Sequence, residues 1–308
     1  MGKIAFLFSG QGAQYPGMMK EFYETYAAAK EVFDTAESVL GRKIAELCFS
    51  GTQEELNLTE NTQPCVLTAD IAALRALEEK GVKPDVVAGF SLGEYAALTA
   101  AGVLPFEETI RLIRIRAEAM QNAVPVGEGG MIAVLGKTAE EVDSLCEEVD
   151  GFVKGANYNC PGQVVVSGDT QALEALKKIG AERKVKMIPL SSSAPFHSER
   201  MEPASRVLKA EFEKLEFHAP TVPLIMNVDA EEENDPAKMK EKLVRQVMAP
   251  VLWEKTLRRM LEMGVDTFIE IGPGRTLSGF VKKTCKGSVS FRVENAETLE
   301  QTLQGLKG

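Results

Sequence analysis

One stretch, Asp85–Leu98, constrains the fold more than any other part of the chain. Its first half is a short apolar run, typical of a buried strand, and its second half is rich in Ala and Leu up to Gly102, typical of a helix that ends at glycine. Between the halves lies Gly89-Phe-Ser91-Leu-Gly93, which has the G-x-S-x-G spacing of a nucleophile elbow. In such an elbow a serine occupies a strained strand-to-helix turn. The order predicts an α/β fold that presents Ser91 at the end of a sheet.

This spacing also occurs by chance, so two interpretations of Ser91 stand side by side. In one, the turn exposes a nucleophilic hydroxyl and points the first N–H groups of the helix, beginning with Leu92, at the charge that develops beside it. In the other, the segment is a tight strand-to-helix turn and the serine has no chemical role.

The chain has two histidines, and their surroundings differ. His197 follows an expected strand and precedes an expected helix, a loop position typical of a catalytic base. His218 precedes Ala-Pro after a charged helix and is expected to be an exposed turn residue. Neutral imidazole can accept a hydroxyl proton near pH 7, so His197 is the candidate general base for Ser91. The alternative for His197 is a helix-capping or packing role.

The helical pattern of residues 106–121 turns a single arginine inward. At about 100° per residue, one charged face carries Glu107, Arg111, Arg114 and Glu118. Arg116 falls on the opposite, apolar side. A guanidinium cannot shed its proton, so a buried one needs an anionic partner. That partner is either an internal Asp or Glu in a structural ion pair, or a carboxylate that belongs to the substrate.

Residues 130–191 alternate clearly between strand and helix patterns. The expected elements, in order, are a strand over Met131–Leu135, a helix over Thr138–Val149, strands over Phe152–Asn157 and Gln163–Ser167, a helix over Thr170–Ile179 and a strand over Lys184–Pro189. This βαββαβ order predicts a ferredoxin-like subdomain, expected to span 125–191. It would be inserted into a catalytic core made of 1–124 and 192–308, with the ligand bound in the cleft between them.

The rest of the core is less distinctive. Lys3–Phe8 is an expected strand that runs into the glycine-rich loop Ser9–Gln14, which could bring N–H groups close to an oxyanion. Further strands are expected over Val222–Val228 and Thr267–Ile271, and a weakly ordered tail is expected at the end of the chain.

The net charge and the cysteine spacing argue against several kinds of binding protein and of stabilising site. A net charge of −10 argues against non-specific binding to nucleic acid or an anionic membrane, since both need a basic field. The five cysteines are scattered without a C-x-x-C pair, so neither a disulfide framework nor a metal site is expected. Reduced thiols are the plain interpretation of these cysteines, so a cytoplasmic location is expected. No run approaches membrane-spanning length.

Several separated motifs, in this order, resemble those of the malonyl-CoA:acyl-carrier-protein transacylases. The matching features are Gly10-Gln-Gly-Ala-Gln14, Gly89-Phe-Ser-Leu-Gly-Glu94, Arg116, Pro195-Phe-His197, Gln246 and Glu270-Ile-Gly-Pro-Gly274. They span nearly the whole chain, and their concordance is far more specific than any one of them. The resemblance implies an α/β-hydrolase-like core with a parallel sheet and a ferredoxin-like insert.

The resemblance also implies a role for individual residues. These roles are an acylated nucleophile for Ser91, a general base for His197, an oxyanion hole for the backbone N–H groups of Gln11 and Leu92, a carboxylate clamp for Arg116, and orientation of the imidazole for the backbone carbonyl of Gln246. It implies malonyl-CoA as substrate, acyl carrier protein with its phosphopantetheine thiol as partner, and no bound cofactor.

One residue departs from the family pattern. Discrete members often carry serine immediately before the histidine. This chain has Phe196 there, and in this respect it resembles the malonyl-selective acyltransferases of polyketide synthases. There the bulky ring is thought to disfavour an α-methyl branch, so Phe196 is a candidate for acyl selectivity. Fatty-acid and polyketide pathways therefore both remain open. The sequence is also compatible with a serine esterase or thioesterase, and with a non-catalytic carrier-binding subunit.

Overall fold

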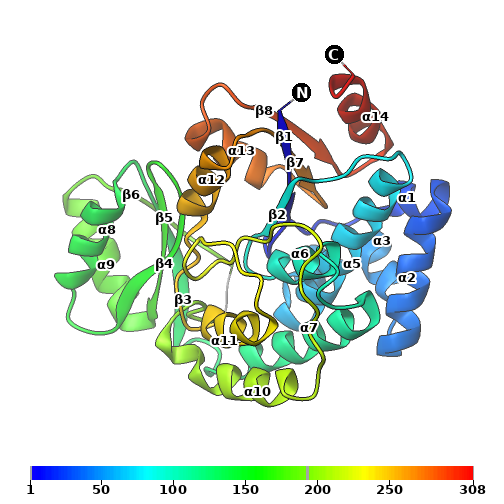
Figure 1. Ribbon diagram of the computed structural model, residues 1–308. Helices are drawn as coiled ribbons and strands as arrows, with labels where there is room; N and C mark the ends of the chain where they lie inside the picture. The colour runs from blue at the N-terminus through cyan, green and yellow to red at the C-terminus, as the bar shows by residue number, and fades with distance from the viewer. Residues whose placement is uncertain (1, 192–193, 308) are drawn as a thin grey trace.

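The computed structural model describes residues 2–191 and 194–307, and it contains a parallel and an antiparallel sheet (Figure 1). In the described residues the parallel sheet has the order β2-β1-β7-β8. Its strands are β1 (Lys3–Phe8), β2 (Val86–Gly89), β7 (Val265–Ile271) and β8 (Val289–Val293). The antiparallel sheet has the order β4-β5-β3-β6 and lies to one side of this core.

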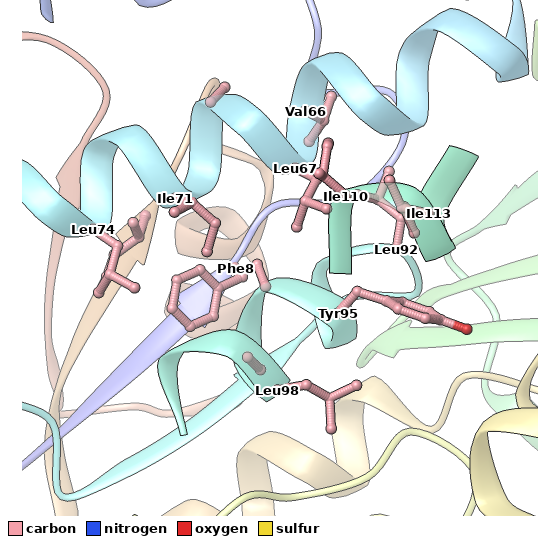
Figure 2. Packing of buried hydrophobic residues seen from close by; sticks show 14 of the residues in the cluster. Phe8, Val66, Leu67, Ile71, Leu74, Leu92, Tyr95, Leu98, Ile110 and Ile113 are labelled. Carbon is pink, nitrogen blue, oxygen red and sulfur yellow. The ribbon is translucent and has the colours of Figure 1, made fainter. Parts of the chain in front are cut away.

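The central strand β1 shows why the core needs helices on both faces. Phe6 and Phe8 belong to one apolar cluster, whereas Ala5 and Leu7 belong to another. Successive side chains of a strand point to opposite faces, so a strand with apolar residues on both faces must be covered on both. Figure 2 shows Phe8 among side chains of the helices on the first face, including Ile71.

The helices of the core divide between these two faces. The first cluster takes side chains from α2 (Ala27–Leu40), α5 (Thr59–Glu78), α6 (Gly93–Ala100), α7 (Phe106–Gln121), α10 (Glu202–Phe212) and α11 (Pro236–Gln246). The second cluster takes side chains from α12 (Trp253–Glu262) and α13 (Thr276–Thr284). The remaining helical elements of the core are α1 (Lys20–Thr25), α3 (Ile44–Ser50), α4 (Gln53–Asn57), the 3₁₀ helix η1 (Glu199–Met201) and α14 (Ala296–Gly305). In the described residues, no helix is both long enough and apolar enough to cross a membrane.

The antiparallel sheet belongs to a βαββαβ unit. Its elements are β3 (Gly129–Leu135), α8 (Ala139–Glu147), β4 (Val153–Cys160), β5 (Gln163–Asp169), α9 (Thr170–Glu182) and β6 (Lys186–Pro189). On β3, Ile132 and Val134 pack under α8 and α9, whereas Met131 and Ala133 join the first core cluster. The predicted fold class, a parallel-sheet α/β core with an inserted ferredoxin-like unit, is confirmed. The domain limits at 125 and 191 stay a prediction, and residue 192, where the core was expected to resume, lies outside the described residues.

Two local predictions are wrong. The expected strand over Val222–Val228 is reduced to isolated bridges, one of which pairs Leu224 with Val87 of β2. Within this segment, the side chain of Asn227 donates a hydrogen bond to the backbone carbonyl of Gly89, at the end of β2. The expected weakly ordered tail contains β8 and α14, because β8 joins the parallel sheet and α14 packs against it.

Strand order places the carboxyl ends of β1 and β7 at a switch point. From β1 the chain proceeds to β2 on one side, and the later strands β7 and β8 lie on the other. In open parallel sheets such a reversal leaves a crevice at the carboxyl ends of the strands, where ligands bind. The loop after β1 and the turn after β2, which carries Ser91, both leave from this edge.

The elbow glycines generate a prediction about stability. A Cβ at Gly93 would lie 2.4 Å from the carbonyl oxygens of both Phe8 and Ser9, so the backbone of β1 would have to move. We expect Gly93→Ala to lower the free energy of unfolding by about 1–3 kcal/mol, the usual cost of overpacking. The matched control is Gly279→Ala in α13, where a Cβ meets nothing within 4 Å. There the change should stabilise by about 0.5–1 kcal/mol, because alanine favours the helix. Urea unfolding of both variants checks this, and equal midpoints would contradict it.

Candidate active site

The turn after β2 has the strained geometry of a nucleophile elbow. Ser91 has φ 55°, a left-handed conformation that is unusual for a residue with a side chain. A Cβ at Gly89 would lie 1.8 Å from the carbonyl oxygen of Gly93, so the two glycines let the strand and the helix approach this closely. The turn places the hydroxyl of Ser91 in a cavity at the sheet edge.

The imidazole of His197 bridges Ser91 and a backbone carbonyl. Its Nε2 lies 2.8 Å from Ser91 Oγ, and its Nδ1 lies 2.8 Å from the carbonyl oxygen of Gln246. A carbonyl oxygen can only accept, so Nδ1 carries the proton and Nε2 presents its lone pair to the hydroxyl. This is the tautomer that a general base needs.

Two influences keep this imidazole neutral. Burial, reinforced by the nearby positive charge of Arg116, lowers the pKa of His197 to about 4. The carbonyls of Gln246 and Ala249 act in the opposite direction but are outweighed. At neutral pH the ring is therefore unprotonated and can accept a proton.

Arg116 is buried and reaches the hydroxyl of Ser91. Its side chain is 1% exposed and lies over the ring of Tyr95, with 5.3 Å between Cζ and the ring centroid. Nη1 donates to Gln63 Oε1 at 2.6 Å, and Nη2 donates to Gln246 Oε1 at 2.9 Å and to Ser91 Oγ at 3.2 Å. Nε has no acceptor in the described part of the chain. All three acceptors are neutral oxygens, so the contacts of Arg116 do not include the internal carboxylate that a structural ion pair would require.

Gln11 and Leu92, whose backbone N–H groups are the expected oxyanion donors, both line the same cavity. In the parts of the chain that the structure describes, neither of these N–H groups donates a hydrogen bond. The loop that carries Gln11 is held by side chains: its own Nε2 donates to Thr59 Oγ1 at 3.3 Å, and Gly12 N donates to Gln14 Oε1 at 2.8 Å. These free donors are suited to an oxyanion, and that role stays a prediction.

The cavity has a volume of about 400 Å³ and lies between the core and the insert. The core contributes Ser91, Arg116 and His197, and the insert contributes Met131 and Asn159. Phe196 is 5% exposed and also lines the cavity, and its carbonyl accepts a hydrogen bond from Ser167 Oγ of the insert. The expected cleft between the two units is therefore present in the described residues, and all the candidate side chains named above lie at or around it.

Sequence reasoning gave no role to three polar residues at the site. Gln63 accepts from Arg116, Asn227 accepts from the N–H of Ser91 at 2.8 Å, and Glu94 accepts from Gln246 Nε2 at 2.8 Å. All three are fully buried. Asn227 interrupts an otherwise apolar run, and a polar residue in such a run is a usable signal of a buried hydrogen bond.

Comparisons with known proteins match nearly the whole chain to one family of acyl transferases. The family model described as acyl transferase domain matches residues 5–303. A malonyl CoA-acyl carrier protein transacylase of Bacillus subtilis is 46% identical over 311 residues, covering 100% of this chain and 98% of the relative. One of Escherichia coli is 41% identical, covering 92% of this chain and 93% of the relative.

Solved structures give the same result. The malonyl CoA-acyl carrier protein transacylase of Clostridium perfringens has a TM-score of 0.95 at 44% identity and covers 99% of this chain and 97% of its own. A malonyl-transacylase solved in complex with a type II polyketide acyl-carrier protein has a TM-score of 0.95 at 37% identity, covering 98% and 99%. The chain therefore belongs to the acyl transferase domain family and, within it, to the malonyl CoA-acyl carrier protein transacylases.

Proposed function

We propose that the chain transfers the malonyl group of malonyl-CoA to the phosphopantetheine thiol of acyl carrier protein in fatty-acid biosynthesis. Transfer is ping-pong, through a malonyl ester on Ser91. The observation that carries the proposal is the position of the Ser91 hydroxyl, within hydrogen-bonding reach of both a neutral imidazole and a buried guanidinium. The first group activates the serine, and the second selects the acyl group.

In the first half-reaction, His197 Nε2 takes the hydroxyl proton while Ser91 Oγ attacks the thioester carbonyl. The resulting oxyanion is stabilised by the N–H groups of Gln11 and Leu92. The intermediate collapses as the bond to sulfur breaks, and the leaving thiolate takes the proton from His197. In the second half-reaction the thiol of the carrier protein repeats the sequence on the malonyl ester, which regenerates the free serine.

Arg116 gives the site its preference for a carboxylated acyl group. In malonyl-CoA one methylene separates the thioester carbonyl from the carboxylate, and Nη2 lies 3.2 Å from the attacking oxygen. One arginine can therefore bind the carboxylate while the serine reaches the carbonyl. A charge-assisted pair of this kind stabilises by about 3 kcal/mol, roughly 100-fold in rate relative to an acetyl group.

Phe196 supports a second candidate within the same chemistry. Its buried ring lines the cavity, where it would oppose an α-methyl branch and restrict the acyl group to malonyl. The same residue, together with the similarity to a transacylase solved with a polyketide carrier protein, favours a trans-acting acyltransferase of a polyketide pathway as the alternative. The two candidates differ in the carrier protein that they serve.

A cytoplasmic location is part of the proposal. All five cysteines are buried free thiols, which suits a reducing compartment. The proposal requires no resident cofactor, because malonyl-CoA brings the acyl group and the carrier protein brings its own thiol.

The malonyl-serine intermediate can be observed directly. Incubation with malonyl-CoA alone should add the mass of one malonyl group to the peptide that contains Ser91, and later addition of the carrier protein in its thiol form should remove it. Ser91→Ala should show no added mass. Release of the group to water at the same rate without the carrier protein would indicate a thioesterase instead.

Removal of the guanidinium should change acyl preference rather than abolish acylation. We expect Arg116→Ala to lower kcat/KM for malonyl-CoA about 100-fold while sparing or raising transfer from acetyl-CoA. Arg111 is an exposed arginine on the same helix, so Arg111→Ala is the matched control. It should leave kcat/KM unchanged for both malonyl-CoA and acetyl-CoA. An unaltered malonyl/acetyl ratio in Arg116→Ala would exclude the carboxylate clamp.

The low pKa of His197 predicts an unusual pH profile. The neutral ring is the base, so activation of Ser91 is present above the pKa and lost as pH falls through about 4, not through the ordinary value near 6.5. Arg116→Ala removes a neighbouring positive charge and should move this midpoint upward. The rate of fluorophosphonate labelling of Ser91 against pH measures both midpoints. A wild-type midpoint near 6.5, or no shift in the variant, would contradict the assignment.

A further inference from the structure

The mechanism so far leaves one buried acid without a role. Glu94 lies in α6, three residues after Ser91, and its side chain is fully buried. Its Oε1 accepts a hydrogen bond from the backbone N–H of Asn227 at 2.7 Å, and its Oε2 accepts one from Gln246 Nε2 at 2.8 Å. One carboxyl group thus ties together two segments that are distant in the chain.

Both partners of Glu94 also hold the backbone of Ser91. Asn227 Oδ1 accepts from the N–H of Ser91 at 2.8 Å, and Gln246 Nε2 donates to the carbonyl of Ser91 at 2.8 Å. The strained serine is therefore fixed on both sides by residues that Glu94 fixes in turn. Strained conformations persist only where the surroundings over-determine them, and these bonds supply that constraint.

The contact with Glu94 also determines which way the amide of Gln246 points. Both N–H groups of its Nε2 are taken, one by Ser91 O and one by Glu94 Oε2. Its Oε1 must therefore face Arg116, whose Nη2 donates to it at 2.9 Å. The backbone carbonyl of the same residue accepts from His197. Gln246 thus contacts the base, the clamp and the nucleophile, and Glu94 sets its orientation.

The contacts of Glu94 are those of a carboxylate. Each oxygen accepts a hydrogen bond from an N–H group, and an N–H group offers no lone pair to a protonated oxygen. Burial raises the pKa of Glu94 to about 8, which by itself would leave the group largely protonated at neutral pH, while its bonds to Asn227 and Gln246 and the charge of Arg116 oppose that rise. Because both oxygens face N–H donors, the hydrogen bonds fit the ionised form. The negative charge also partly balances the buried guanidinium, one amide away.

We propose that Glu94 is a positioning residue, whose carboxylate holds Asn227 and Gln246 so that Ser91, His197 and Arg116 keep their relative geometry. The proposal rests on the proposed function for the roles of these three residues. It acts on the activation of Ser91 itself, so it can be tested without malonyl-CoA.

Glu94→Gln is the first test because it keeps the size and removes the second acceptor. An amide presents one oxygen, so whichever way it turns, one of the two N–H donors faces another N–H group. We expect the rate of fluorophosphonate labelling of Ser91 to fall about 10-fold or more. Glu31→Gln, the same change at an exposed position of α2, is the matched control and should keep the wild-type rate. A Glu94→Gln rate within threefold of this control would overturn the proposal.

A double-variant cycle separates positioning from a loss of folded protein. Rates are taken per active site, counted by the final extent of labelling, so that unfolded chains do not contribute. If Glu94 acts through the side chain of Gln246, Glu94→Gln combined with Gln246→Ala should be much closer to the slower single variant than to the product of the two effects. Fully multiplied effects would show that the two residues act independently and would overturn the link.

A second variant serves if Glu94→Gln does not fold. Glu94→Asp keeps the charge but is one methylene shorter and cannot reach both partners, so an undiminished labelling rate in this variant would overturn the positioning role.

Two further outcomes keep the proposal distinct from the proposed function. A wild-type chain that reacts with the fluorophosphonate but never carries a malonyl group would refute the proposed function alone. A malonylated wild type with an unaffected Glu94→Gln variant would refute the positioning role alone.

Discussion

A permanent positive charge buried beside the Ser91 hydroxyl is the constraint on which the rest of the site depends. Arg116 cannot lose its proton, so its burial must be offset by hydrogen bonds, by the ring of Tyr95 and by a nearby negative charge. The direct acceptors are neutral oxygens, which leave its positive potential available to a ligand. The same charge helps to keep His197 unprotonated. In the proposed function, one guanidinium therefore serves both acyl selection and the neutral state of His197.

This charge gives a physical reason for a dyad in place of a triad. In many serine enzymes of related geometry an acid orients the histidine, whereas here the carbonyl of Gln246 does so. A carboxylate at that point would add a negative charge beside the cavity and weaken its attraction for the carboxylate of malonyl. The carbonyl selects the same tautomer of His197 without adding a charge. The buried acid of the site, Glu94, instead lies behind the amide of Gln246 and contacts the polar groups that hold the elbow.

The accuracy of the sequence predictions follows the range of the interactions concerned. The elbow, the inward face of α7 and the βαββαβ order all arise from patterns within one or two consecutive elements, and the structure contains each of them. The segment around Leu224 was predicted as a full strand because its apolar run satisfies the local pattern. It pairs with β2 only at an isolated bridge, and Asn227 is drawn to the elbow by hydrogen bonds. The ordered tail was missed because its stability comes from packing on the parallel sheet.

The sequence by itself determined that a serine would occupy a strained turn, that one arginine would face inward, and that a compact insert would interrupt the core. Each follows from residue periods and glycine positions that act over a few residues. Tertiary structure alone decided the strand order β2-β1-β7-β8 and the contacts that join Ser91 to Asn227 and Gln246, which are 136 and 155 positions away. Backbone hydrogen bonds between strands carry little information about which strand is the partner, and a buried amide can satisfy any donor or acceptor that packing brings to it. These pairings therefore appear only when the whole core closes.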